Sequence, residues 1–153
     1  MIAIGVGCRK GCPAAAIVAL VRRALAALSS PGRGWRCRRR VRACAHRKTL
    51  ALTPALSPGG RGGRTVLATA ARKRYEPGIR AAARLLALPL VIVRDGALAA
   101  AQGRTHTHSA RVAALVGVPS VAEAAALAAV GWHGRLAVTR MNTSRVTCAI
   151  ACG

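Results

Sequence analysis

The segment Ile2-Ala3-Ile4-Gly5-Val6-Gly7-Cys8-Arg9-Lys10-Gly11 opens the chain and indicates an α/β fold. Residues 2–6 are apolar and include β-branched side chains, which predicts a buried strand. A glycine-rich loop with two cations follows, and Pro13 begins a helical pattern over 14–28, because proline suits the first turn of a helix. A strand, a cationic glycine loop and a helix N-terminus together predict a place that holds anions. The glycine spacing differs from G-x-G-x-x-G, so a dinucleotide site of the Rossmann type is not expected.

The alternation of strands and helices continues through the rest of the chain. Apolar runs predict strands at 65–69, 89–93, 135–139 and 145–151, the last two joined as a hairpin. Helical patterns cover 76–87, 97–102, 109–116 and 121–130, with a turn at Asp95-Gly96 before the second of these. Ser120, with Glu123 three residues later, predicts a capping box at the start of the last helix. This order predicts a three-layer α/β/α domain with a mixed sheet of about five strands.

Residues 30–64 interrupt this single domain of residues 1–153. They combine Pro, Gly and Ser with ten of the 25 Lys and Arg residues and none of the three acids. Like-charge repulsion and the scarcity of bulky apolar groups predict an exposed, disordered insertion. Its part 52–64 resembles the translated palindromic repeats scattered through GC-rich bacterial genomes, which implies an acquired segment with no selected role. A gene product inactivated by this insertion is therefore one alternative for the whole chain.

The net charge of +22 favours, taken alone, a nucleic-acid binder. Without residues 30–64 the chain still has 15 cations against three acids, or +12. A non-specific, basic nucleic-acid-binding protein is therefore a second alternative. Specific recognition of nucleic acid is not expected, because the sequence has neither aromatic stacking platforms nor a helix-turn-helix pattern.

Targeting signals and metal sites are not expected. The start of the chain lacks a basic region before an apolar core, and the apolar run 112–130 is broken by Gly, Pro and Glu, so no membrane span is predicted. A cytoplasmic protein with reduced thiols is the resulting expectation. The cysteines and histidine of the insertion lack zinc-site spacing, and His106 and His108 stand in a polar stretch where solvated side chains are favoured over metal ligands.

Three motifs, in order, carry a resemblance to a known family. They are G-x-G-C-R-x-G over 5–11, T-x-x-x-K-x-x-E-x-G over 69–78 and S-V-A-E-A-A-A-L over 120–127. Over 1–29 and 65–153 the chain resembles the CobE family, which is similar to the C-terminal domain of CbiG, both in cobalamin biosynthesis. CbiG-type proteins open a δ-lactone on a cobalt-precorrin and release a two-carbon fragment as acetaldehyde. The resemblance implies a role in building the corrin ring, with δ-lactone hydrolysis, as in cobalt-precorrin-5A hydrolase, as the implied chemistry. The chain has no room for the N-terminal domain of CbiG, so it looks like the stand-alone CobE form.

The implied ligand is a carboxylate-rich tetrapyrrole of the precorrin class, with other corrin-pathway enzymes as further partners and no cofactor. Its carboxylates need cations and helix N-termini, and its ring needs an apolar face. Open α/β sheets bind ligands at loops that follow strands. Arg9, Lys10 and Lys73 stand where loops follow strands and are expected to bind the ligand. The resemblance implies as further ligand-binding residues Gly5, Gly7, Cys8, Gly11, Thr69 and Ser109. Glu76 and Glu123 are the candidate catalytic bases on water, with N–H groups of the glycine loop stabilising an oxyanion.

Several of these residues also have simpler structural explanations. Cys8 can be a small residue in a tight loop rather than a nucleophile, and Glu123 can serve the capping box alone. Lys73 can belong to a solvated face, and Ser109 can be a helix cap. Whether the protein is a catalyst or only binds its ligand is left open at this point.

Overall fold

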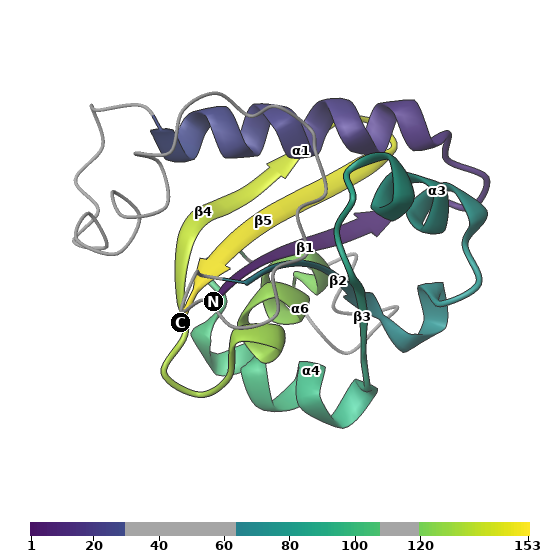
Figure 1. Cartoon of the computed structure of the whole chain (residues 1–153). Coiled ribbons are helices and arrows are strands. Elements are labelled where there is room, and N and C mark those ends of the chain that lie inside the picture. Colours follow the sequence, from purple (N-terminus) through teal and green to yellow (C-terminus); the bar gives the residue numbers. More distant parts are fainter. Residues whose placement is uncertain (30–63, 108–119) are drawn as a thin grey trace.

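A computed structural model gives the fold and describes residues 1–29, 64–107 and 120–153 (Figure 1). The strands are β1 Ile2–Cys8, β2 Thr65–Ala70, β3 Leu90–Val93, β4 Arg135–Asn142 and β5 Val146–Cys152. The helices are α1 Ala14–Ser29, α3 Pro77–Leu85, α4 Asp95–Ala101 and α6 Val121–Val130, with short 3₁₀ turns η1 Ala71–Lys73 and η2 Gln102–Arg104. The predicted α/β class and the mixed five-stranded sheet are both confirmed in this part of the chain.

The sheet has the strand order β3-β2-β1-β5-β4, so the first strand of the chain lies at its centre. β1 pairs in parallel with β2, and β2 in parallel with β3. On its other side β1 pairs antiparallel with β5 along its whole length, from Ile2 opposite Cys152 to Cys8 opposite Val146. The β4–β5 hairpin completes the sheet, with register shifts in β4 between Leu136 and Met141. The end of β1 and the beginning of β5 therefore lie at the same edge.

Helices cover both faces of the sheet, as the three-layer prediction requires. α1 and α3 lie on one face, and α4 and α6 lie on the other (Figure 1). Successive residues of β1 face opposite sides of the sheet. Ile4 and Val6 pack in the core beneath α1 and α3, while Gly5 faces α6. The core beneath α6 is built largely from alanines of α6, β2 and β5, which allow the helix to approach the sheet closely.

Two local expectations need correction, and two others lie outside the described residues. Asp95 and Gly96 are not a turn, because they form the first turn of α4, where an acid is favourable beside the positive helix end. Ser120 is the N-cap residue of α6 as predicted, but its side chain makes no capping hydrogen bond, so the capping box is wrong. The helix expected at 109–116 and the insertion, except Arg64, lie outside the described residues.

Arg64 continues the parallel pairing rather than belonging to the insertion, since its carbonyl accepts a 2.9 Å hydrogen bond from the Ile2 N–H. Across the described ranges, none of the helices combines the length and the hydropathy that a membrane crossing requires.

Candidate functional site

The candidate site lies at the sheet edge where the parallel strands β1, β2 and β3 end and where β5 begins. Residues 9–13 follow β1, and residues 71–76 follow β2 and lead into α3. The β4–β5 turn reaches the same place, because the Arg9 N–H donates to the Arg145 carbonyl at 2.9 Å. Three segments that are distant in sequence therefore meet at one edge, the usual ligand side of an open α/β sheet.

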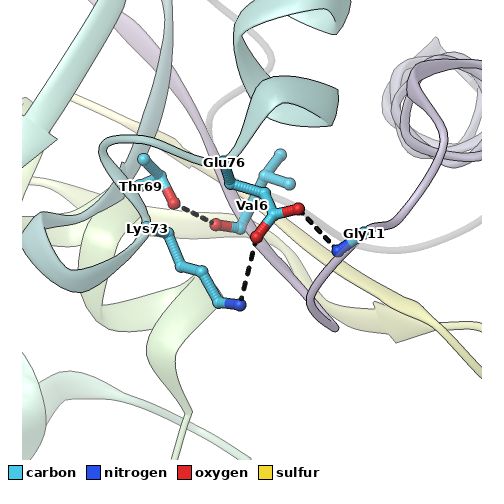
Figure 2. A network of polar contacts seen from close by, with 5 residues as sticks. All are labelled: Val6, Gly11, Thr69, Lys73 and Glu76. Carbon is cyan, nitrogen blue, oxygen red and sulfur yellow. Dashed lines mark hydrogen bonds and ion pairs between the residues drawn. The ribbon is translucent and has the colours of Figure 1, made fainter.

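Glu76 ties two of these segments together. Its Oε1 accepts a 2.7 Å hydrogen bond from the Gly11 N–H, and its Oε2 lies 3.6 Å from the Lys73 Nζ. Figure 2 shows the carboxylate between the Gly11 backbone and the Lys73 side chain. Gly11 has a φ of +70°, a left-handed conformation that glycine adopts without steric cost. The glycine of the cationic loop thus aims its N–H at a fixed carboxylate.

Threonine hydroxyls support the strand ends on both sides of β1. Thr69 is fully buried, and its Oγ1 donates to the Val6 carbonyl at 2.9 Å (Figure 2). Thr147 on β5 donates to the Gly7 carbonyl at 3.2 Å. An added Cβ on Gly7 would lie 2.8 Å from that Thr147 hydroxyl. Thr69 and Gly7 are therefore packed elements of the edge that hold the cationic loop in place.

Positive charge exceeds negative charge around this edge. Arg9 and Lys10 are exposed, and Lys73 is 25 % exposed beside Glu76. The only other acid on the rim, Asp95, is 4.0 Å from Arg72 in an exposed pair. Within the described residues, Arg9, Lys10 and Arg145 form no ion pair with an acid. Charges that the fold leaves uncompensated are available to an anionic ligand.

The surroundings of Cys8 and Cys12, at the end of β1 and in the loop after it, change the pKa values of both thiols. Burial raises the pKa of Cys8 to about 11, although the nearby Lys73 ammonium opposes the rise. Burial also raises the pKa of Cys12, opposed chiefly by Arg145. A thiol with such a pKa is almost wholly protonated at neutral pH, so its nucleophilicity is low. The raised pKa therefore favours the packing explanation of Cys8 over nucleophilic catalysis.

Glu123 has a different environment from Glu76 because it is fully buried at the first turn of α6. Its Oε2 accepts hydrogen bonds from the N–H groups of His106 and Thr107 at 2.8 and 2.9 Å. Its Oε1 accepts from the Thr107 hydroxyl at 2.6 Å and from the Arg140 N–H at 2.8 Å. Arg140 lies where the β4–β5 register is irregular, and the carboxylate receives its N–H there. Glu123 thus joins α6 to β4 and to the segment 106–107.

Because the ionised Glu123 carboxylate accepts these hydrogen bonds, the stability of the folded protein should fall in acid. Burial would raise its pKa, but the hydrogen bonds from Thr107, Arg140 and His106 outweigh burial and bring the pKa below its ordinary value of 4.5. A folded-state pKa below the unfolded value means that the stabilisation is present above about pH 4.5 and is lost as pH falls through the folded pKa. Thermal unfolding followed by circular dichroism should show Tm constant above pH 5 and falling below pH 4.5. A Glu123→Gln variant should show a much smaller fall, and an equal fall in both proteins would contradict this assignment.

The structure brings together most, but not all, of the residues proposed from the sequence. Cys8, Arg9, Lys10, Gly11, Lys73 and Glu76 share the edge described above. Gly5 lies away from the loop, because an added Cβ there would lie 1.9 Å from the Ala122 carbonyl oxygen of α6. Ser109 lies outside the described residues.

Arg145 and Thr147 are members of the edge that the sequence motifs do not include. The available signal was the terminal hairpin, since an antiparallel last strand begins where its parallel neighbours end. As to metals, no group of three or more His, Cys, Asp or Glu side chains in the described ranges is arranged to hold an ion.

Comparisons with known proteins agree with this fold. The family described as "Cobalamin synthesis G C-terminus" matches residues 2–151. The crystal structure of CobE, a protein from the cobalamin (vitamin B12) biosynthetic pathway, is similar with a TM-score of 0.70 and 29 % identity, covering 99 % of this chain and 89 % of that one. The cobalamin biosynthesis protein chiG from Agrobacterium tumefaciens str. C58 is similar with a TM-score of 0.61 and 32 % identity, covering 99 % and 97 %. No curated protein sequence matches the chain. The chain therefore belongs to the cobalamin synthesis G C-terminal family and is a cobalamin biosynthesis protein of the CobE/CbiG type.

Proposed function

We propose that this protein binds a carboxylate-rich tetrapyrrole of the precorrin class at the edge formed by residues 9–11, 71–76 and 145. The observation that carries the proposal is the excess of uncompensated cations, Arg9, Lys10 and Arg145, around a loop whose backbone already accommodates one carboxylate, that of Glu76. A precorrin carries acetate and propionate groups around its rim, so several cations can each engage a different carboxylate.

The expected energies explain why several cations are needed. An exposed ion pair contributes only about 0.2–1 kcal/mol, while a charge-assisted hydrogen bond shielded from water contributes about 1.5–3 kcal/mol. One exposed arginine is therefore insufficient for specific binding. Three or four cations on a rigid edge, combined with burial of an apolar ring face, can reach micromolar affinity, about 8 kcal/mol.

The proposal also includes a chemical step, hydrolysis of a lactone on the bound ligand. Glu76 is the candidate general base, because its side chain is held in place by Gly11 and Lys73 and is 8 % exposed, with lone pairs left to accept from a water molecule. In lactone hydrolysis this water would lose a proton to Glu76 while its oxygen attacks the lactone carbonyl. The ring C–O bond would then break, and the departing alkoxide would take that proton back from Glu76, which leaves a carboxyl group and a hydroxyl group on the opened ligand. Glu123 is a weaker candidate, since it is fully buried and both oxygens are occupied by hydrogen bonds within the fold.

Binding is tested by removing one rim cation at a time. Arg9→Ala and Lys73→Ala should each weaken the binding of uroporphyrin, a planar tetrapyrrole whose side chains are all carboxylates, by roughly three- to tenfold. The matched control is Arg135→Ala, an exposed arginine at the start of β4 and therefore at the opposite sheet edge. Titration by absorbance at constant ionic strength measures all four proteins. Equal affinity in the wild type and both rim variants would overturn the proposed site.

Catalysis is tested separately from binding. Glu76→Gln should retain tetrapyrrole binding within about threefold and lose the release of acetaldehyde from a lactone-bearing cobalt-precorrin. Turnover by the Glu76→Gln variant at the wild-type rate would remove Glu76 as the base while leaving the binding proposal intact.

A further inference from the structure

Tyr75 is a large aromatic side chain placed at the tip of a rigid turn on the cationic edge. The Glu76 N–H donates to the Lys73 carbonyl at 3.0 Å, so Arg74 and Tyr75 are the two central residues of a closed turn. The ion pair between Lys73 and Glu76 closes the same turn through its side chains. Tyr75 thus has an ordered backbone, although its side chain is 72 % exposed.

The exposure of this ring has no explanation in the packing of the fold. The chain has three aromatic residues, and two of them, Tyr75 and Trp132, lie in the described ranges. Neither contributes to the two cores, which are built from aliphatic side chains. What distinguishes Tyr75 from Trp132 is its position on the turn that joins Lys73 to Glu76, where a ligand bound at the cationic edge would cover the exposed ring.

Arg74 holds the Tyr75 ring in one orientation, which favours stacking of a flat ligand. Its guanidinium lies 4.5 Å from the centroid of the Tyr75 ring, a cation–π contact that restrains the orientation of the ring. Because the guanidinium lies over one face of the exposed ring, a ligand would stack on the opposite face, next to a positive charge. Flat π-systems that carry carboxylates present both complementary features in one molecule.

We propose that Tyr75 is the stacking platform for the ring face of the ligand and thereby distinguishes a tetrapyrrole from other polycarboxylates. This inference rests on the proposed function, because it assigns the apolar contact at the same edge to which Lys73 and Arg9 bring charge. The cations alone bind any polyanion. The phenol ring adds a contact that only a flat, extended π-system can use.

The chain supplies a closely matched control at its opposite edge. Trp132 is 73 % exposed and also has a guanidinium over its ring, that of Arg104 at 5.3 Å. It lies in the connection from α6 to β4, where Arg104 donates to the carbonyls of Gly131, Trp132 and Gly134. Those bonds use backbone oxygens, so Trp132→Ala leaves them in place.

The test compares Tyr75→Ala, Tyr75→Phe and Trp132→Ala in the full chain, with uroporphyrin and citrate as probes. Tyr75→Ala should weaken uroporphyrin binding roughly five- to thirtyfold, whereas Tyr75→Phe and Trp132→Ala should stay within about twofold of the wild type. Binding of citrate, which has carboxylates but no ring, should be the same in all four proteins. The porphyrin absorbance maximum should shift on binding to the wild type and shift less with Tyr75→Ala.

The outcomes separate this inference from the function on which it rests. Uroporphyrin binding that depends on Lys73 and Arg9 but is unchanged in Tyr75→Ala would overturn the stacking role and leave the proposed function standing. No uroporphyrin binding by the wild type would overturn both. A single-stranded oligonucleotide that displaces uroporphyrin, and whose own affinity falls in Tyr75→Ala by a larger factor, would overturn the assignment to a tetrapyrrole in favour of nucleic acid.

Discussion

A Gly5→Ala variant is expected to lose about 3 kcal/mol of unfolding free energy, or to fail to fold. Gly5 lies on the central strand beneath α6, and an added Cβ would lie 1.9 Å from the Ala122 carbonyl oxygen and 2.8 Å from the Ala126 nitrogen. Both obstacles are helix backbone, so no side-chain rotation relieves the clash. The helix as a whole would have to move away from the sheet, which would open the alanine-rich core beneath it.

Gly96→Ala is the control for this prediction. Gly96 lies in α4, and beyond its chain neighbours and the backbone of its own helix nothing lies within 4 Å of an added Cβ, so alanine there should be neutral or stabilise by about 0.4–1 kcal/mol. Urea unfolding followed by circular dichroism measures both variants. A Gly5→Ala protein whose unfolding free energy lies within 1 kcal/mol of the wild type would show that α6 does not lie against β1 as described.

Glu123→Gln is expected to destabilise the protein by about 3–5 kcal/mol at neutral pH. Four donors, namely three backbone N–H groups and the Thr107 hydroxyl, point at the Glu123 carboxylate. An amide offers one acceptor oxygen, and in either orientation its NH₂ group would face at least one backbone N–H, which cannot accept. Only the Thr107 hydroxyl can reverse its role, so buried polar groups would be left unpaired. The loss should appear as a lower urea midpoint with little change in the slope of the transition.

Asp95→Asn makes the same chemical change at an exposed position. Asp95 is 69 % exposed and lies 4.0 Å from Arg72 in the first turn of α4, so the variant should lose less than about 1 kcal/mol. A similar cost for both substitutions would contradict the claim that Glu123 is a buried structural acceptor.

The fold could be read from the sequence because its signals are local. The apolar run 2–6, the proline before the first helix and the terminal hairpin each specify an element by periodicity or turn chemistry, and β1, α1, β4 and β5 all occur near the expected positions. The family motifs then placed Lys73 and Glu76 at a strand end, where the structure pairs them with each other.

The hydrogen-bond partners of Glu123 could not be predicted from the sequence. Ser120 and Glu123 have the spacing of a capping box, but the hydrogen-bond partners of Glu123 come from residues 106, 107 and 140. That choice depends on where an irregularity in β4 frees an N–H and on how α6 faces it, which are tertiary facts with no local signature. The exposure of Tyr75 could not be predicted for a related reason, because the exposure of a turn residue depends on what packs around it.

The pairing of β1 with β5 also has consequences for how the protein forms during synthesis. β1, the central strand, leaves the ribosome before the other strands of the sheet, whereas the strand that covers one of its edges comprises residues 146–152. Until those residues emerge, β1 presents an open edge to other chains, with no native partner for its hydrogen bonds on that side. Closing the sheet joins strands from the two ends of this domain, so folding should be slow for a domain of this size and should finish only after residues 146–152 have emerged. The Arg9–Arg145 contact belongs to the same closure, so the proposed binding edge is complete only once the sheet has closed.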